Sequence, residues 1–349
     1  MEEEKYMQRC IQLAQNGHNN VPPNPMVGAV IVCDNKTIGE GYHIKFGGPH
    51  AEVNAINSIK DRSLLKRSTL YVSLEPCSHY GKTPPCADLI IQKEIPKIVI
   101  GCQDPFREVA GRGIKKLRDA GRDVIVGFME KECKELIKQF TTFHLLKRPY
   151  ITLKWAESSD GYIDIEREKG SPIILSTELT SMLVHKRRAE SNAIMVGTRT
   201  AQLDNPALTV RNWYGNHPTR VVIDRRLTLP LSLHLFDNSI KTLVFTEEQY
   251  AKTIDEKIEY ITLDFKADII PQILTALHNR RIQSLFVEGG TILLQSFINN
   301  SLWDEVFIEE NPIKLGSGVK SPQINDKNKD FIEKHFGRVI HHYINKNEK

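Results

Sequence analysis

The stretch LYVSLEPCSHYGKTPPC, residues 70–86, decides how the first part of this chain folds. Its apolar beginning is typical of a buried strand, and this strand leads directly to Pro76 and Cys77. A second proline precedes Cys86 at the predicted start of a helix. Upstream, the segment GGPHAEVNAI (47–56) brings His50 and Glu52 into the first turn of another predicted helix. A histidine, a carboxylate and two cysteines are therefore expected at strand ends and helix starts, where the backbone holds side chains rigidly.

These residues are predicted to form a catalytic zinc site. His50, Cys77 and Cys86 make a set of three ligands, which leaves the fourth tetrahedral position for water, as in catalytic rather than structural zinc sites. Two thiolates reduce the acidifying effect of the metal, so a neighbouring carboxylate must accept the proton. Glu52 is placed for that role, and the pattern H-x-E followed by two cysteines is typical of zinc deaminases acting on cytosine or adenine.

The loop between the two cysteines is longer than in that deaminase pattern. The residues SHYGKTPP separate the cysteines, where the general pattern has only two residues. His79 and Lys82 lie within this loop and offer cationic or hydrogen-bonding groups beside the metal. The loop therefore indicates recognition of an anionic group such as a phosphate.

Short apolar runs alternate with helical periodicity along the chain, which predicts an α/β protein. In the first part, a three-layer α/β/α sandwich is expected, with strands at 29–33, 69–75, 97–101 and 123–128 and helices at 2–16, 50–60, 86–93, 111–120 and 130–143. A second series of strands is expected at 150–155, 193–197, 219–224, 241–246, 284–290 and 305–310. Pro149 disfavours helical geometry at Arg148, which predicts two domains, 1–148 and 149–349. The Asn- and Lys-rich tail after about residue 322 is expected to be loosely ordered.

Composition excludes several classes of protein. The chain has 349 residues, 40% hydrophobic and 26% charged, which is ordinary for a globular protein and unlike a disordered or collagen-like chain. A formal net charge of +4 does not require nucleic acid. Six cysteines are too few for a disulfide framework, so reduced thiols or metal ligands are expected, with Cys10, Cys33, Cys102 and Cys133 in the core. The acidic N-terminus and the absence of a long apolar run predict a cytoplasmic protein without a membrane span.

The order of motifs resembles the family of bifunctional riboflavin biosynthesis deaminase-reductases over essentially the whole chain. The deaminase half is similar in NPMVGAVIV (24–32), GGPHAEVNAI (47–56), residues 70–86 and QDPFREVAGRGI (103–114). The reductase half is similar in TLKWAESSDGYI (152–163), AQLDNPALTVR (201–211) and FVEGG (286–290). This resemblance implies a cytidine-deaminase-like sandwich followed by a dihydrofolate-reductase-like α/β domain. The chain departs from the family at GSPIILST (170–177), which lacks a tryptophan, and at Glu157, where a small residue is usual.

The resemblance also implies two successive reactions on one phosphorylated pyrimidine. The first is zinc-dependent deamination of 2,5-diamino-6-ribosylamino-4(3H)-pyrimidinone 5′-phosphate. The second is NADPH-dependent reduction of the ribosyl chain, which yields 5-amino-6-(5-phosphoribitylamino)uracil. A small phosphorylated pyrimidine is therefore the expected partner, and a homo-oligomer is expected.

Site residues follow from the matching motif positions. For the deaminase substrate, the resemblance implies contacts by Asn24, His43, His79 and Lys82. For the reductase substrate, it implies Lys154, Ser171, Arg188, Leu208, Arg211 and Glu288. For NADPH, it implies Thr200, Asp204, Gly289, Gly290 and Thr291, with Asp204 also beside the opened sugar. The turn at 289–291 opens a predicted helix, whose free amide groups can meet a cofactor phosphate.

Two alternatives stay open. A zinc deaminase that edits nucleic acid would share the zinc site, but a shorter cysteine loop and a basic stripe with interleaved aromatic residues would be expected of it. A non-catalytic zinc- and nucleotide-binding scaffold would need no Glu52.

Overall fold

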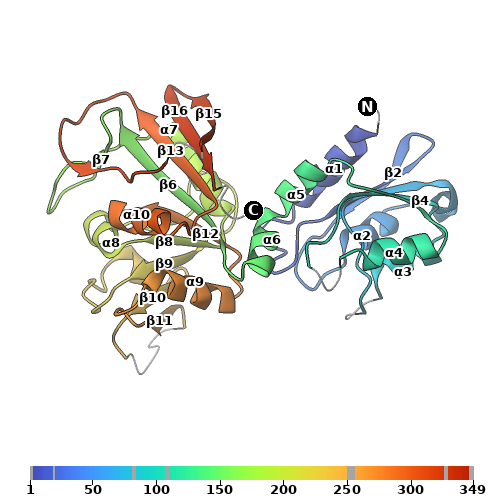
Figure 1. Cartoon of the computed structure of the whole chain (residues 1–349), viewed down its shortest axis with the longest axis horizontal. Helices are drawn as coiled ribbons and strands as arrows, with labels where there is room; N and C mark the ends of the chain where they lie inside the picture. Colours follow the sequence, from blue (N-terminus) through green and yellow to red (C-terminus); the bar gives the residue numbers. More distant parts are fainter. Residues whose placement is uncertain are drawn as a thin grey trace. The chain divides into compact units, whose positions relative to one another are not determined.

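The computed structural model describes residues 3–18, 20–80, 84–106, 110–249, 256–325 and 329–345. The chain divides into two compact units, Met1–Lys147 and Arg148–Lys349 (Figure 1). Both units are α/β, which confirms the predicted fold class. In the described ranges, no helix combines the length and the apolar character that a membrane span requires.

The first unit contains a five-stranded sheet in the order β2-β1-β3-β4-β5. Strands β3 and β4 run parallel, as do β4 and β5, whereas β1 is antiparallel to both of its neighbours. Their bounds are β1 Gly28–Cys33, β2 Lys36–Tyr42, β3 Thr69–Leu74, β4 Lys97–Cys102 and β5 Asp123–Val126. Parallel β3 and β4 end at the same edge of the sheet, and Cys77 lies just beyond that edge.

Helices cover both faces of this sheet and give the predicted three layers. Helices α1 (Glu4–Gln15) and α5 (Glu130–Leu136) share one core cluster with Val30, Tyr71 and Val99. Helices α2 (Ala51–Asn57), α3 (Cys86–Gln92) and α4 (Arg112–Asp119) share the other with Ile31, Val72 and Ile100. Alternate residues of each strand thus face opposite helical layers. The four cysteines outside the cluster of predicted ligands are buried, as expected.

Two predictions for this unit need correction. The helix expected at 130–143 is two helices, α5 and α6 (Lys138–Leu145), because Ile137 leaves helical geometry (φ −105°, ψ 14°). Strand β2 was not predicted, since its sequence KTIGEGY is polar and rich in glycine. Those glycines serve packing: a Cβ at Gly41 would lie 2.3 Å from the backbone nitrogen of Ala55 in α2.

The second unit contains a nine-stranded sheet in the order β11-β10-β9-β8-β12-β6-β13-β16-β15. Strands from β11 to β13 in that order are parallel, and β16 and β15 are antiparallel additions at one edge. The bounds are β6 Tyr150–Ser158, β8 Ala193–Val196, β9 Thr219–Ile223, β10 Thr242–Thr246, β11 Ile258–Thr262, β12 Ser284–Gly289 and β13 Glu305–Asn311. A small separate pair joins β7 (Tyr162–Asp164) and β14 (Val319–Lys320).

The expectation of a loosely ordered tail is wrong for most of that segment. Residues Lys329–His335 form β15 and residues Arg338–Ile344 form β16, which pairs with β13. Ile340 and Tyr343 are buried in this hairpin. The Asn and Lys residues around the hairpin conceal its alternating pattern in the sequence.

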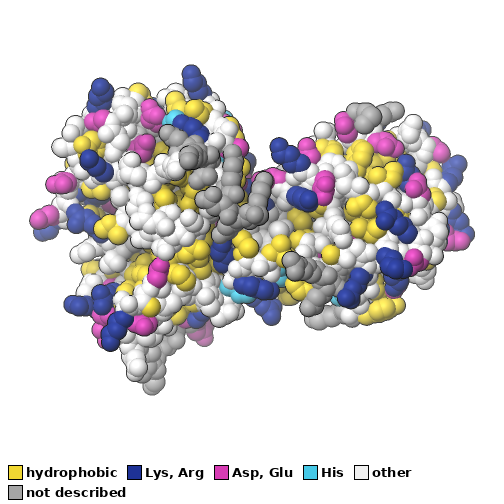
Figure 2. Space-filling model, in the orientation of Figure 1, with side chains coloured by type: hydrophobic (Ala, Val, Ile, Leu, Met, Phe, Trp, Pro, Cys, Tyr) yellow, Lys and Arg dark blue, Asp and Glu magenta, His cyan; other side chains and the backbone are white. Residues whose placement is uncertain are grey.

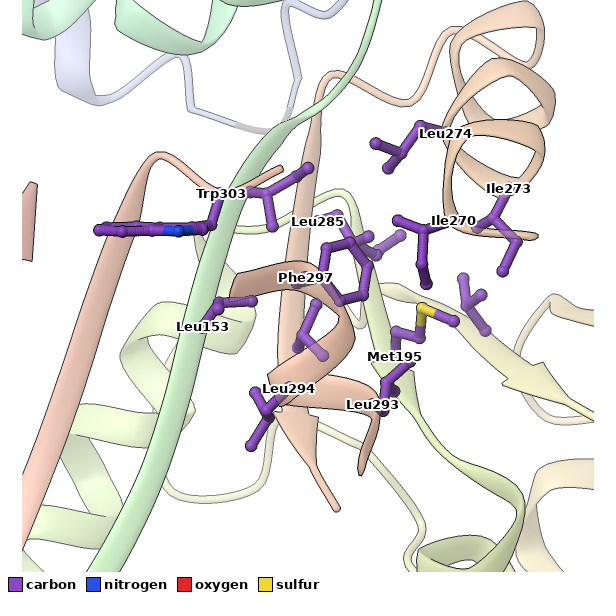
Figure 3. Packing of buried hydrophobic residues seen from close by; sticks show 14 of the residues in the cluster. Leu153, Met195, Ile270, Ile273, Leu274, Leu285, Leu293, Leu294, Phe297 and Trp303 are labelled. Carbon is purple, nitrogen blue, oxygen red and sulfur yellow. The ribbon is translucent and has the colours of Figure 1, made fainter. Parts of the chain in front are cut away.

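Helices also cover both faces of the second sheet. Helices α9 (Ile269–Asn279) and α10 (Thr291–Asn299) pack on one face, where Phe297 lies among Leu285, Met195 and Ile270 (Figure 3). The other face is covered by a cluster that includes residues of α7 (Glu178–Ala189) and α8 (Thr198–Asp204). Helices α8 and α10 begin just after β8 and β12, so both helix starts lie at one edge of the sheet.

Candidate functional site

The predicted zinc ligands lie together at one edge of the first sheet. His50 is the residue that precedes α2, Cys86 is the first residue of α3, and Cys77 follows β3. The ligand atoms of all three lie within 4.8 Å of one another, and no other such cluster occurs among the described residues. The backbone N–H of Cys86 donates to Cys77 Sγ at 3.3 Å, and the N–H of Ala87 donates to the Cys77 carbonyl at 3.1 Å.

The donor set fits zinc. His50 Nδ1 lies 3.6 Å from Cys77 Sγ and 3.4 Å from Cys86 Sγ. A tetrahedral ion with Zn–N of about 2.0 Å and Zn–S of about 2.3 Å needs these atoms about 3.5 Å apart. A hydrogen bond from Cys86 and the adjacent His50 ring lower the pKa of Cys77, so this thiol ionises first. Mixed thiolate and imidazole ligation favours zinc over the hard cations.

Glu52 lies in the first turn of α2 and is 3% exposed. Burial raises the pKa of its carboxyl, with the nearby Cys77 adding to the effect. A carboxyl with a raised pKa can hold a proton nearer to neutral pH than an exposed one. This environment suits a group that takes up and returns a proton beside a metal.

Asn24 and His43 lie next to the ligand set. The Asn24 amide Nδ2 is 3.0 Å from His43 Nε2, and His43 Nδ1 is 3.0 Å from the Pro49 carbonyl. Donation from Nδ1 to the carbonyl leaves Nε2 to accept from the amide, and burial lowers the pKa of His43, which favours this neutral form. The ring of His43 meets that of His50 edge to face at 5.4 Å. His79 is exposed, and Lys82 lies outside the described residues.

In the second unit, two predicted substrate residues pair with each other. Arg188 of α7 donates to both carboxylate oxygens of Glu288 at the end of β12, each at 2.6 Å. It also donates to the Thr209 carbonyl at 3.1 Å, next to Leu208. Leu208 has a buried side chain and a φ of +52°, so its backbone is the part available for contact.

Lys154 and Arg211 occupy different surroundings. Lys154 Nζ on β6 lies 3.5 Å from a carboxylate oxygen of Glu309. Arg211 is exposed, and its backbone N–H donates to His185 Nδ1 at 3.1 Å. Ser171 is also exposed.

Four of the predicted cofactor residues, Thr200, Gly289, Gly290 and Thr291, lie around the starts of α8 and α10, whereas Asp204 is the last residue of α8. Gly197, just before α8, donates its N–H to the Gly289 carbonyl at 2.9 Å. A Cβ at Gly290 would lie 3.1 Å from Thr200 Oγ1, so a side chain there would crowd Thr200. The Thr291 hydroxyl donates to the Lys320 carbonyl at 2.7 Å, and Thr291 is the first residue of α10, where backbone N–H groups have no partner within the helix. The structure thus brings together Thr200 and the 289–291 turn, which are far apart in sequence.

Several residues of this region were not predicted. Arg167 forms ion pairs with Asp164 and with Asp204 at the end of α8, and it donates to the Gly170 carbonyl at 2.9 Å, which fastens the start of the atypical segment 170–177. Glu309 is 2% exposed and accepts hydrogen bonds from Ser176 and Thr180, each at 2.6 Å. The second glutamate in EVFIEEN, an ionisable residue in an apolar strand, is the sequence feature that indicates Glu309. Nothing local indicates that Arg167 would meet Asp204.

Comparisons with known proteins match a family to each unit. Residues 1–102 match the family model "Cytidine and deoxycytidylate deaminase zinc-binding region", and residues 149–337 match "RibD C-terminal domain". The chain is 37% identical over 321 residues to riboflavin biosynthesis protein RibD of Aquifex aeolicus, covering 91% of this chain and 89% of that protein. It is 38% identical over 329 residues to RibD of Bacillus amyloliquefaciens, covering 92% and 87%.

A solved structure has the same fold over the whole chain. The diaminohydroxyphosphoribosylaminopyrimidine deaminase/5-amino-6-(5-phosphoribosylamino)uracil reductase of Thermotoga maritima superposes with a TM-score of 0.89 at 36% identity, covering 99% of both chains. RibD of Acinetobacter baumannii superposes with a TM-score of 0.87 at 30% identity, covering 98% of both. The chain therefore belongs to the RibD family of riboflavin biosynthesis enzymes, and it is a bifunctional deaminase and reductase whose cofactors are Zn²⁺ and NADPH.

Proposed function

We propose that residues 1–148 remove the 2-amino group of 2,5-diamino-6-ribosylamino-4(3H)-pyrimidinone 5′-phosphate as ammonia. Residues 149–349 then reduce the ribosyl chain of the product to a ribityl chain. The observation that carries this proposal is the buried Glu52 beside the His50, Cys77 and Cys86 cluster, in a chain of the RibD family. A structural zinc site would not need that carboxylate.

In the deaminase site, His50, Cys77 and Cys86 hold the metal. When bound there, zinc supplies the Lewis acidity that makes a water molecule nucleophilic at neutral pH. Glu52 would take the two protons of that water in turn and deliver the first to the ring nitrogen and the second to the leaving amino group, which departs as ammonia. Its raised pKa supports both steps, because the same carboxyl must accept and donate.

Substrate binding in this site is assigned to Asn24, His43, His79 and Lys82. The amide Nδ2 of Asn24 lies 3.0 Å from His43 Nε2, and the amide oxygen is the group that would accept from a substrate N–H. His79 and Lys82 belong to the long loop between the cysteines, where they would bind the phosphorylated side of the substrate.

In the reductase site, Lys154, Ser171, Arg188, Leu208, Arg211 and Glu288 contact the substrate. NADPH supplies the hydride. Thr200, Asp204 and the turn Gly289–Thr291 bind it, since the amides at the start of α10 suit a phosphate group. The pairing of Arg188 with Glu288 orients both side chains at the end of β12, which supports a role in holding the sugar against the cofactor.

The partner is a small phosphorylated pyrimidine rather than a nucleic acid or a membrane, and the enzyme is cytoplasmic and homo-oligomeric in this proposal. Basic and acidic side chains are interspersed on the face of each unit that Figure 2 shows, which supports a small-molecule substrate. Incubation with single-stranded DNA and RNA oligonucleotides tests the nucleic-acid alternative, because a base-editing enzyme would release ammonia from them.

The test is ammonia release and NADPH oxidation by the zinc-loaded protein with the enzymatically generated substrate. The variant Glu52→Gln should retain zinc and lose about 10²–10⁴-fold in the rate of ammonia release, as removal of a general acid-base does. Its control in the same unit is Glu40→Gln, which changes a half-buried carboxylate paired with Arg9. Arg211→Ala should slow NADPH oxidation and spare ammonia release. Normal deamination by Glu52→Gln would refute the assignment.

A further inference from the structure

Glu75 has an unusual set of partners for a buried carboxylate. It is 6% exposed, and its oxygens accept hydrogen bonds from four backbone N–H groups. One oxygen accepts from Asp104 at 3.2 Å and from Gly111 at 2.9 Å, and the other accepts from Gly113 at 2.9 Å and from Ile114 at 3.2 Å. All four donors belong to the motif QDPFREVAGRGI (103–114), for which neither reaction has supplied a role.

The same residue is two positions from a metal ligand. The N–H of Glu75 donates to the Cys102 carbonyl at 3.0 Å, which ties the end of β3 to the end of β4. The next carbonyl along the chain, that of Pro76, lies against the first turn of α4, where a Cβ at Gly113 would be only 2.0 Å from it. Hence the backbone on the N-terminal side of Cys77 rests on α4.

The other side of Cys77 rests on α3. Cys86 and Ala87 donate their N–H groups to the sulfur and the carbonyl of Cys77. Cys77 is thus held between two helix starts, and Glu75 supplies the hydrogen bonds on the α4 side. Four amide donors on one carboxylate also fix the direction in which the chain leaves β3.

We propose that Glu75 is a positioning residue of the deaminase site, which fastens Asp104 and residues 111–114 to the end of β3 and so fixes the backbone that presents Cys77. The inference rests on the proposed function of the His50, Cys77 and Cys86 cluster as a zinc site. Glu75 does not touch the metal. It acts through Cys77, in the way that groups beyond the ligands tune metal sites.

The substitution Glu75→Gln tests this role with little change in shape. A glutamine has one acceptor oxygen and one NH₂ group, so either orientation of the amide leaves two of the four N–H groups facing a donor. Glu75→Asp keeps the charge but shortens the side chain by one methylene, and it is the milder variant should Glu75→Gln fold poorly.

The measurement is the rate of zinc transfer from the full-length, zinc-loaded protein to an excess of a chelating dye. Loss of an outer-shell partner is expected to speed release by about 10- to 100-fold in Glu75→Gln, with a smaller increase in Glu75→Asp. Reduction of the separately supplied deaminated substrate should continue at the wild-type rate.

Two controls separate positioning from general stability. Asp224→Asn, in the second unit, changes a 2% exposed carboxylate that accepts N–H groups of Thr228 and Leu229. Asp61→Asn, in the first unit, changes an exposed carboxylate that accepts from Ser63. Both should release zinc as the wild type does. The role of Glu75 would be overturned if Glu75→Gln transferred zinc at the wild-type rate while its melting temperature fell as much as that of Asp224→Asn. The substitution would then have lowered stability without affecting the zinc site. A wild-type protein that holds no zinc would instead overturn the proposed function.

Discussion

Replacement of Arg220 by methionine should destabilise the second unit and weaken its reductase activity. Arg220 lies on β9 and is completely buried. Its guanidinium donates to the carbonyls of Ala207 at 2.9 Å and His234 at 2.8 Å, and to the Asp237 carboxylate at 2.7 Å. One side chain therefore holds the loop before Leu208 against the segment around His234.

The magnitude follows from these contacts. Removing one partner of a buried ion pair costs about 3–5 kcal/mol, because the remaining polar groups lose their partner. Asp237 is partly exposed and can be hydrated after the substitution, so we expect the lower part of that range, about 3 kcal/mol. For a domain of this size, that corresponds to a melting temperature lower by roughly 6–12 °C.

The three tryptophans of the chain, at 155, 213 and 303, all lie in the second unit, so their fluorescence during urea titration reports its unfolding. Arg226→Met is the matched control, because Arg226 is exposed and its pair with Glu247 is worth only about 0–1 kcal/mol. We also expect a raised KM for the reductase substrate and unchanged ammonia release. A loss of stability no larger than that of Arg226→Met would refute the reasoning.

The pH dependence of the same variant provides a second check. Arg220 holds the pKa of Asp237 well below its usual range, so the pair contributes its full stability above the unfolded-state pKa and loses it only in acid. The stability difference between wild type and Arg220→Met should be constant from about pH 5 upward and shrink below about pH 4.

Three further outcomes are expected. Gly28→Ala should destabilise the first unit by about 1–3 kcal/mol or more, because the added Cβ would lie 1.9 Å from the Cys10 carbonyl oxygen. Loss of zinc during a urea titration measures this destabilisation. An unchanged midpoint of that titration would contradict the packing argument. Arg188→Met and Glu288→Gln should each abolish NADPH oxidation. The loss of folding stability in the double variant should be smaller than the sum of the losses in the two single variants, because each single variant leaves one charge unpaired. A double-mutant cycle followed by tryptophan fluorescence measures this difference. Burial lowers the pKa of His185 from 6.5, so the unfolded chain binds more protons than the folded chain and stability falls as the pH drops below 6.5. His185→Gln should flatten this dependence of stability on pH, which denaturation at several pH values measures.

The cluster of His50, Cys77 and Cys86 was predictable because it depends on residue types at short spacings. His50 with Glu52, and Cys77 with Cys86, each stand at a junction of strand and helix that local patterns mark. The ordered α/β alternation likewise follows from periodicity, which reports burial on one face of an element. Weak local patterns explain the errors. Strand β2 shows no apolar alternation because glycines occupy the positions that face α2. The final hairpin is concealed by its charged and polar surroundings.

By itself, then, the sequence determined the two-domain α/β class and the grouping of His50, Cys77 and Cys86 with the carboxylate of Glu52. The tertiary structure alone decided which distant residues meet: Thr200 with Gly290, Arg188 with Glu288, and Asp204 with Arg167. It also decided that Glu75 would collect four amide donors from the 103–114 segment. The physical reason is that local periodicity records which face of an element is buried, whereas pairing between distant side chains depends on strand order and on the loops that close each sheet edge.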